Sequence, residues 1–446
     1  MNMERLDNIQ SSCLLLFTIF LMVSSFNAGY SISLAILIVF ELYRYFNIKN
    51  KQPMIIRSMV PPKVILKLFG LFFGALLISA VYHGGSTIHS TWKYIYWAFP
   101  FIPLFYSYVK DKAELAFFMG SSVALLILSV KGWMQIRDLF LDIQVKSWRV
   151  TSMFSAPNDY GQIVEQVLPV IILGCLWGFY KWKTSHEKIY LYSFVVQTIT
   201  ILLSLIPFIG SFSRGAIAGF VGGGLFVIIL YSVISIKRYI RYIFVIMLSI
   251  LAVVSGFLAF NKVVDSNMRS MLPSNTVQAS LVSNIPDESF NHHSDTGTDI
   301  SRVYDKERLL MWESSYNMWK DHLVLGVGFD QWQQQYEKHY IIDCAEERIV
   351  PMPHNNTVYF FSTTGIVGGI AYIVFSIGVL IYFVIQMYKN PQNILLPIMI
   401  WMWCAIMVHG QVDSGITNKF VMHILCGTMG LVCGSIKNHP INNNYN

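Results

Sequence analysis

The chain of 446 residues is too apolar for an ordinary soluble domain. Hydrophobic residues make up 54% of it and charged residues only 13%, with a mean hydropathy of +0.50, whereas a soluble domain has about 25% charged residues. The net charge of +7 falls mostly in short loops between apolar stretches, so it gives no support to nucleic-acid binding. The composition therefore predicts an all-α polytopic membrane protein embedded in a lipid bilayer.

Apolar stretches suited to a helix of roughly 17 to 25 residues, the length that crosses a bilayer, recur along the chain, and we expect about 12 transmembrane helices. The expected spans lie near residues 11–26, 31–45, 64–82, 92–108, 115–131, 160–180, 189–209, 213–236, 239–260, 355–387, 395–408 and 416–435. The first two are short and the tenth is overlong. A signal peptide is the alternative for the first stretch, but no clear cleavage site follows it.

Basic residues in alternate short loops predict which side of the membrane each loop occupies, because Lys and Arg are retained in the cytoplasm during insertion. These residues are Arg44, Lys49, Lys51, Arg57, Lys63, Lys110, Lys112, Lys181, Lys183, Lys188, Lys237, Arg238 and Arg241. With an even number of spans, both termini are expected to be cytoplasmic, and the remaining loops are expected on the outer side.

The long polar loop divides the chain into three parts. Residues 1–260 are expected to form a transmembrane bundle of nine spans, in which 132–159 is an amphipathic segment suited to lying on the outer membrane surface. Residues 261–354 are expected to form an outer loop with a helical cap between spans 9 and 10. Residues 355–446 are expected to form spans 10 to 12.

The cap is predicted from residues 303–323, where Arg308, Trp312, either Ser315 or Tyr316, and Trp319 fall on one stripe of an amphipathic helix. The glycines of Gly326-Val327-Gly328 are expected to end this helix.

The sequence predicts no metal site and no cofactor. The six cysteines make no CxxC motif or disulfide framework, and only Cys344 falls in the outer loop. One cluster has metal-binding side chains but lies in a Ser- and Asn-rich stretch without a fixed framework. It consists of His292, His293, Asp295 and Asp299.

Arg214 is expected at the start of the eighth span, after Ser213 as a helix cap. The positive end of the helix dipole and a planar guanidinium together attract phosphate. The alternative is that Arg214 extends to the lipid headgroups. Gly215 and Gly219 have the GxxxG spacing that lets a neighbouring helix approach closely.

Further polar residues are expected at the same outer mouth. His354 is the candidate general base, because imidazole titrates nearest neutral pH. Arg308 and Arg149 are candidate anion-binding residues, although a paired, solvated charge is the commoner role of a lone helix arginine such as Arg308. The remaining candidates are Asn158, Asn355 and Asn356, which we expect to cap the sixth and tenth spans.

Four motifs in a fixed order resemble the O-antigen ligase and polymerase superfamily. They are the segment 151–169, SRGA at 213–216, the Arg308 and Trp312 helix followed by LGVG at 325–328, and His354-Asn355-Asn356 followed by glycines up to Gly369. The resemblance runs from about Arg149 to Gly369, while the first five spans match in hydropathy alone.

This resemblance implies a metal-independent, inverting GT-C glycosyltransferase of the bacterial inner membrane, with a periplasmic active site. It would transfer a glycan from undecaprenyl diphosphate to an acceptor sugar, on lipid A–core for a ligase or on a carrier-linked polysaccharide for a polymerase. His354 would be the general base, and Arg214 and Arg308 would hold the diphosphate. We favour the ligase by analogy, because one long outer loop precedes His354.

Other polar residues border the same mouth. Lys419 lies in the outer part of the last span, where a charge is expensive and often functional, and it is a candidate phosphate ligand. His409 and Asp413 border the same entrance and Glu165 lies one to two turns into the sixth span. For these three, pairing with a nearby arginine is the alternative to a role in the site. Two other classes of function remain, a secondary transporter and a lipid scaffold without catalysis.

Overall fold

The computed structural model describes residues 3–23, 27–49, 60–141, 148–234 and 300–438. Within these ranges the chain forms helices and turns without any β-strand, which confirms the expected all-helical fold. The chain divides into two units, Met1–Val227 with Glu307–Asn446, and Ile228–Lys306. In the second unit only the end of one helix and the start of another are described, so the expected ninth span lies outside the described residues.

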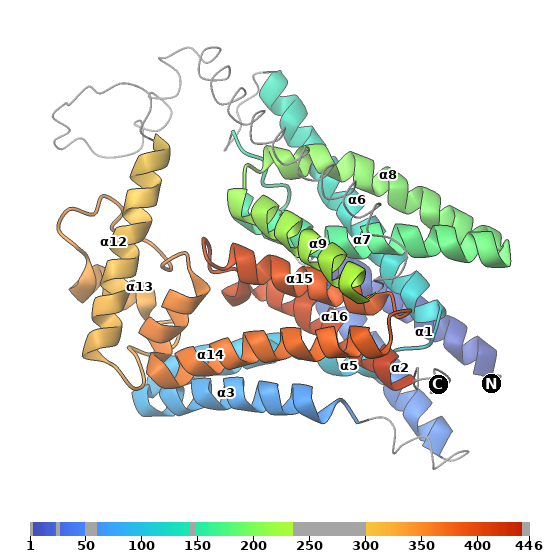
Figure 1. The fold of residues 1–446 in the computed structure, drawn as a ribbon, viewed down its shortest axis with the longest axis horizontal. Helices are drawn as coiled ribbons and strands as arrows, with labels where there is room; N and C mark the ends of the chain where they lie inside the picture. The colour runs from blue at the N-terminus through green and yellow to red at the C-terminus, as the bar shows by residue number, and fades with distance from the viewer. Residues whose placement is uncertain (1–2, 24–26, 50–59, 142–147, 235–299, 439–446) are drawn as a thin grey trace. The chain divides into compact units, whose positions relative to one another are not determined.

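Figure 1 shows the helices, several of which are long enough to cross a bilayer. They are α1 (Met3–Val23), α2 (Asn27–Lys49), α3 (Lys63–His83), α4 (Gly85–Trp97), α5 (Phe101–Tyr106), α6 (Lys112–Phe140), α7 (Pro157–Ser185), α8 (Lys188–Gly210), α9 (Arg214–Ile234), α12 (Ile300–Asp321), α13 (Trp332–Gln335), α14 (Asn356–Lys389), α15 (Leu395–His409) and α16 (Lys419–Asn438). Among the described residues, eight helices are long and apolar enough to span, namely α1, α3, α6, α7, α8, α9, α14 and α16. The protein is therefore a multi-pass membrane protein.

The expected fourth span is two helices, α4 and α5, and not one. The break falls at Ala98–Pro100, where Phe101 and Ile102 donate their amide hydrogens to carbonyls only three residues back. Proline has no N–H to donate and disfavours a helical conformation in the residue before it. Hydropathy alone does not register this interruption.

The expected amphipathic segment 132–159 is only partly a separate element, because α6 continues to Phe140. Gly132 does not break the helix. A Cβ added there would lie 2.8 Å from the Cβ of Pro207, so the glycine gives α8 room to pack against α6.

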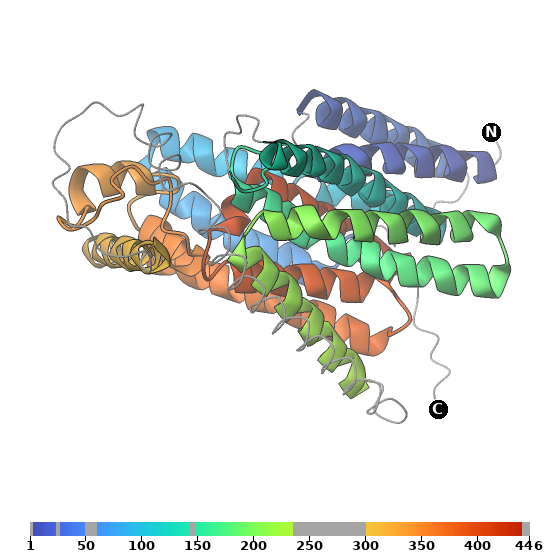
Figure 2. The same cartoon turned by 90° about the horizontal axis from the view of Figure 1, so that it is seen from above.

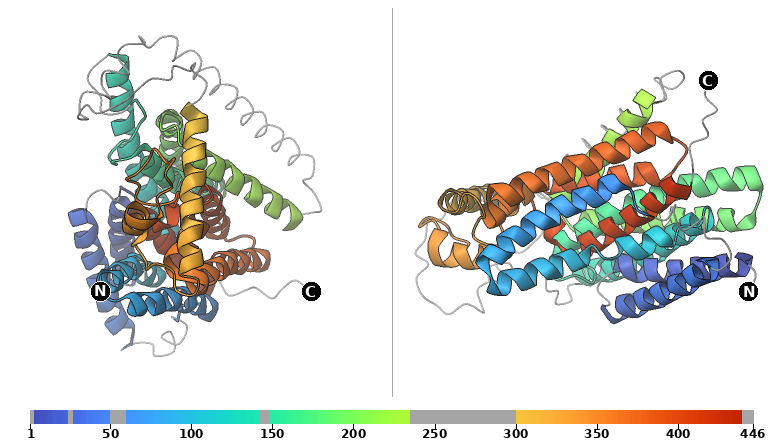
Figure 3. Two further views of the ribbon diagram at one scale, coloured as in Figure 1. Left: turned by 90° about the vertical axis from the view of Figure 1, so that its left-hand side faces the viewer. Right: turned by 90° about the horizontal axis from the view of Figure 1, so that it is seen from below.

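The helices differ in how deeply they are enclosed. In an apolar stretch of 18 residues taken from each helix, 83% is buried in α16, against 22% in both α8 and α9. Figure 2 shows α7 and α8 running side by side, and Figure 3 shows the same for α3 and α14. α8 and α9 therefore have large surfaces that the described helices leave uncovered, while α16 belongs to the core.

The overlong tenth span is explained by an interruption of α14 at Gly365, whose φ is 66°. The connection after α12 enters this break. Val327 and Gly328 donate backbone hydrogen bonds to the carbonyls of Ser362 (3.0 Å) and Thr363 (2.8 Å). Backbone groups freed by the break are thus satisfied by the cap.

The connection is also held by α3, because Ser79 Oγ donates to the Leu325 carbonyl at 2.7 Å and the His83 ring bonds to the Gly326 carbonyl. The cap is therefore attached to two helices of the bundle.

The predicted stripe of α12 is confirmed, with Ser315 rather than Tyr316 as its third member. Ser315 is buried and accepts from the indole N–H of Trp332 at 2.8 Å, whereas Tyr316 is exposed. Trp319 packs edge-on against Phe361 of α14, with ring centroids 5.6 Å apart. The stripe therefore faces the rest of the cap and the start of α14.

Candidate functional site

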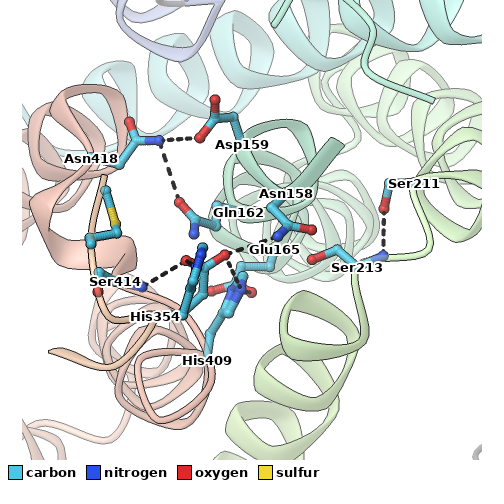
Figure 4. A network of polar contacts seen from close by, with 12 residues as sticks. Asn158, Asp159, Gln162, Glu165, Ser211, Ser213, His354, His409, Ser414 and Asn418 are labelled. Atoms are coloured by element: carbon cyan, nitrogen blue, oxygen red, sulfur yellow. Dashed lines mark hydrogen bonds and ion pairs between the residues drawn. The ribbon is translucent and has the colours of Figure 1, made fainter. Parts of the chain in front are cut away.

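His354 lies in the loop immediately before α14, and its Nδ1 is 3.0 Å from Oδ1 of Asp413. The imidazole is 25% exposed, while the carboxylate is 9% exposed. A neutral imidazole that donates Nδ1–H to a carboxylate presents its Nε2 lone pair as a proton acceptor. His354 thus has the arrangement of an oriented base at the edge of the bundle (Figure 4).

Asn355 and Asn356 hold His354 in this place. Asn355 is the N-cap of α14, as expected, because its side-chain oxygen accepts from the Val358 amide at 3.0 Å. Its side-chain nitrogen donates to the Gln411 carbonyl at 3.0 Å. Asn356 is the first helical residue, not a cap, and its backbone N–H donates to the Gly410 carbonyl at 2.7 Å. The two asparagines therefore join the start of α14 to the end of α15.

Asp413 is held by several donors. Besides His354, the Ser414 amide donates to Oδ1 at 2.8 Å and the Asn158 side chain donates to Oδ2 at 3.1 Å. Burial by itself would raise the pKa of Asp413, but the hydrogen bond and charge of His354, the charge of His409 and the Ser414 amide together hold it below its usual value. The carboxylate is therefore ionised at neutral pH.

A second, fully buried pair lies behind Asp413. His409 Nδ1 is 2.7 Å from Oε2 of Glu165, and the two side chains are 1% and 0% exposed. His409 Nε2 lies 4.0 Å from Oδ2 of Asp413. The alternative of pairing with an arginine is not what the structure shows for Glu165 and Asp413, because His409 and His354 are their partners.

Arg214 is the first residue of α9 and is exposed. The GxxxG spacing that follows permits the close approach that we expected. A Cβ added to Gly215 would lie 2.8 Å from Nε2 of His409, and one added to Gly219 would lie 2.6 Å from the Ala405 carbonyl. The positive end of α9, with Arg214 in its first turn, is therefore packed on the ring of His409.

Arg308 reaches the same region from α12. It is partly buried, and its charge lies close enough to His409 to interact with it. One turn further along α12, the indole N–H of Trp312 donates to the Pro353 carbonyl at 2.8 Å. The cap thus contributes both a guanidinium to the site and a direct contact to the residue before His354.

Arg149 and Asn158 form a connection at the start of α7. Arg149 donates from Nε to the Ser211 carbonyl and from Nη2 to Oδ1 of Asn158, each at 2.8 Å. The expectation that Asn158 caps α7 is wrong. The cap position is Ala156, and Asn158 in the first turn bridges Arg149 and Asp413. Arg149 therefore braces the site through Asn158.

Lys419, at the start of α16, points elsewhere. Its Nζ donates to Oδ1 of Asn27 at 2.9 Å. The neighbouring Asn418 donates to Oδ1 of Asp159 at 2.8 Å. Asp159 was not singled out from the sequence. The signal that was available is a polar stripe on an otherwise apolar helix, at Asn158, Asp159, Gln162, Glu165 and Gln166.

Within the described ranges, no three or more His, Cys, Asp or Glu side chains are grouped to hold a metal ion. The His292 to Asp299 cluster lies outside the described residues.

Residues 199–373 match a family model described as O-antigen ligase (Wzy_C). The match runs from the middle of α8 through the cap to the first half of α14, so it includes Arg214, Arg308 and His354 but neither Glu165 nor the 409–413 turn. A search of curated proteins finds no match. Family members are membrane glycosyltransferase-like enzymes. Over residues 199–373 the matched domain confirms the resemblance to the O-antigen ligase and polymerase superfamily.

Proposed function

We propose that this protein is an O-antigen ligase that transfers a glycan from undecaprenyl diphosphate to a sugar of lipid A–core, on the periplasmic face of the inner membrane. The observation that carries the proposal is the His354–Asp413 pair, 3.0 Å apart at the start of α14, in which His354 lies inside the matched family region. An oriented base at a membrane surface is what a glycosyl transfer from a lipid carrier requires.

In the proposed reaction the acceptor hydroxyl oxygen attacks the anomeric carbon of the donor glycan. The bond between that carbon and the diphosphate oxygen breaks, and its electron pair leaves with undecaprenyl diphosphate. The hydroxyl proton passes to Nε2 of His354, and Asp413 stabilises the imidazolium that forms. Attack on the face opposite the leaving group inverts the anomeric centre.

The leaving diphosphate needs positive charge that is already in place. Arg214 supplies a guanidinium together with the amide groups at the start of α9, and Arg308 supplies a second guanidinium from the cap. Preorganised donors of this kind stabilise developing charge without reorganisation during the reaction. In this proposal four residues hold the site in place without contacting the diphosphate, namely Arg149, Asn158, Asn355 and Asn356. Lys419 is left out because its Nζ donates a hydrogen bond to Asn27.

Disruption of the gene in its host distinguishes the two members of the superfamily. A ligase mutant makes core-only lipopolysaccharide and accumulates carrier-linked polymer, which is the expected result. Core carrying a single repeat would identify a polymerase. Unchanged glycans would contradict both assignments and favour transport or scaffolding.

His354→Ala tests the site in a complementation assay of that mutant. We expect transfer to fall by at least about 100-fold, since a positioned general base contributes about that much or more. His339→Ala is the matched control, because it removes an exposed histidine of the same outer region. Normal lipopolysaccharide in His354→Ala cells that contain the protein at wild-type level would reject the catalytic role.

A further inference from the structure

Four titratable side chains form a path of contacts from the partly exposed His354 to the buried Glu165. Figure 4 labels three of them, His354, His409 and Glu165. His354 touches Asp413 at 3.0 Å, Asp413 lies 4.0 Å from His409, and His409 touches Glu165 at 2.7 Å. The proposed reaction uses only the first two. His409 and Glu165 are too deeply buried to meet a substrate.

Hydrogen bonds and close packing hold the buried pair of His409 and Glu165 in place. Both carboxylate oxygens of Glu165 are engaged, Oε2 by His409 and Oε1 by the side-chain nitrogen of Gln166 at 3.0 Å. Two glycines let α9 pack directly against the pair. A Cβ at Gly215 would strike the His409 ring, and one at Gly219 would lie 3.3 Å from Oε2 of Glu165. A buried ion pair adds little net stability compared with apolar side chains of similar size. Stability therefore does not account for its presence.

The arrangement of charges suggests what the pair does. Asp413 lies between two imidazoles, and a carboxylate favours the protonated form of each. The groups facing His409 are Glu165 from α7, Asp413 from the turn after α15 and Arg308 from α12, while α9 presents Gly215 with Arg214 beside it. A proton shared between Glu165 and His409 places a positive charge on the His409 side of Asp413. That charge opposes the addition of a second positive charge on His354.

We propose that His409 and Glu165 form a positioning pair that keeps His354 unprotonated, and so able to accept a proton, at neutral pH. The inference rests on the proposed role of His354 as the base.

Glu165→Gln tests the proposal, because it removes the negative charge that holds a proton on His409. The rate of glycan transfer would be measured from pH 5.5 to 9 with purified protein, using lipid-linked glycan and core lipid extracted from the host. We expect the acid limb of the pH–rate profile to move up by about one pH unit, so that the rate falls more at pH 6.5 than at pH 8.5. Glu165→Asp keeps the charge and is expected to keep the wild-type limb.

Glu114→Gln is the matched control. Glu114 is a buried carboxyl of α6, 5% exposed, that accepts from the Tyr108 hydroxyl at 2.6 Å and has no contact with the site. Its replacement is expected to leave the pH–rate profile in place.

An equal fall in rate at every pH, or an unmoved acid limb, would overturn the proposal and leave the pair a structural one. If Glu165→Gln does not fold, the double variant Glu165→Gln with His409→Gln replaces the charged pair by a neutral hydrogen-bonded pair and has to show the same shift. If His354→Ala is inactive but the acid limb does not move in Glu165→Gln, this inference is rejected and the proposed base is kept. Transfer by His354→Ala would instead reject the proposed base.

Discussion

At the scale of single residues, Asp413 makes the most contacts in the site, and its ionisation predicts a dependence of stability on pH. Its pKa lies below the usual value of about 4, so the folded state favours the carboxylate. The stabilisation is fully present above that usual value and is lost as the pH falls through the lower value of the folded protein.

Asp413→Asn removes this contribution. We expect the variant to unfold at a lower temperature than the wild type at pH 7, and we expect the difference to shrink below about pH 4. Thermal unfolding in detergent at pH 7, 5 and 3.5 measures it. Asp343→Asn, at an exposed position of the cap, serves as the control. A difference in unfolding temperature that stays constant across this pH range would contradict the assignment.

The two arginines proposed to hold the diphosphate make a separate prediction. Arg214→Ala and Arg308→Ala are each expected to lower transfer by about 100-fold or more, since the loss of one preorganised donor has that effect in other active sites. Membrane expression is expected to stay at the wild-type level because Arg214 is exposed and Arg308 only partly buried. Arg137→Ala is the control, because Arg137 pairs with its neighbour Asp138 at 2.6 Å. Wild-type turnover in either variant would reject the diphosphate role.

At the scale of elements, the break in α14 explains how the cap is attached. The backbone conformation of Gly365, with φ 66° and ψ −163°, is open almost only to glycine and costs other residues about 1–3 kcal/mol, and a Cβ there would strike the Val324 carbonyl. Gly365→Ala is therefore expected to destabilise the protein by at least about 2 kcal/mol, from strain and overpacking together.

Gly74→Ala provides the contrast, because a Cβ at this position of α3 meets nothing within 4 Å. Alanine in an open helical position is neutral or stabilising by about 0.5–1 kcal/mol. The melting temperatures of both variants in detergent check the pair of expectations. Equal melting temperatures would show that the cap connection does not depend on the break.

The elements also show where sequence patterns succeed and where they fail. Hydropathy predicted the long spans because burial in lipid selects apolar residues over a whole helix. It failed at Ala98–Pro100, where a proline interrupts the helix within an apolar run. It also failed at Gly132, where the helix continues through a weak helix former because the glycine allows close helix packing.

The site was predictable only in part. His354, Arg214 and Arg308 could be selected because each lies in a local motif. The partner of His354 lies 59 residues further along, and Glu165 and His409 are separated by 244 residues. Pairings of this kind depend on tertiary packing, which the order of residues does not express.

At the scale of the whole molecule, the distribution of charge makes one further prediction, which concerns the side of the membrane on which the site lies. Lys181, Lys183 and Lys188 flank the turn between α7 and α8, and the positive-inside rule assigns that turn to the cytoplasm. The start of α7, which carries Asn158, then faces the periplasm, as transfer from a carrier on that face requires.

Cys344 allows a direct test, since it is exposed in the cap while the other five cysteines are buried or partly buried. A membrane-impermeant maleimide is expected to label Cys344 in cells whose outer membrane alone has been permeabilised, and Cys344→Ser is expected to abolish that labelling. Adding Ser185→Cys to Cys344→Ser places a thiol at the exposed end of α7, which is expected to react only after the inner membrane is opened. The reverse order of labelling would put His354 in the cytoplasm, where a periplasmic transfer to lipid A–core is impossible. That result would reject the proposed ligase function together with the topology.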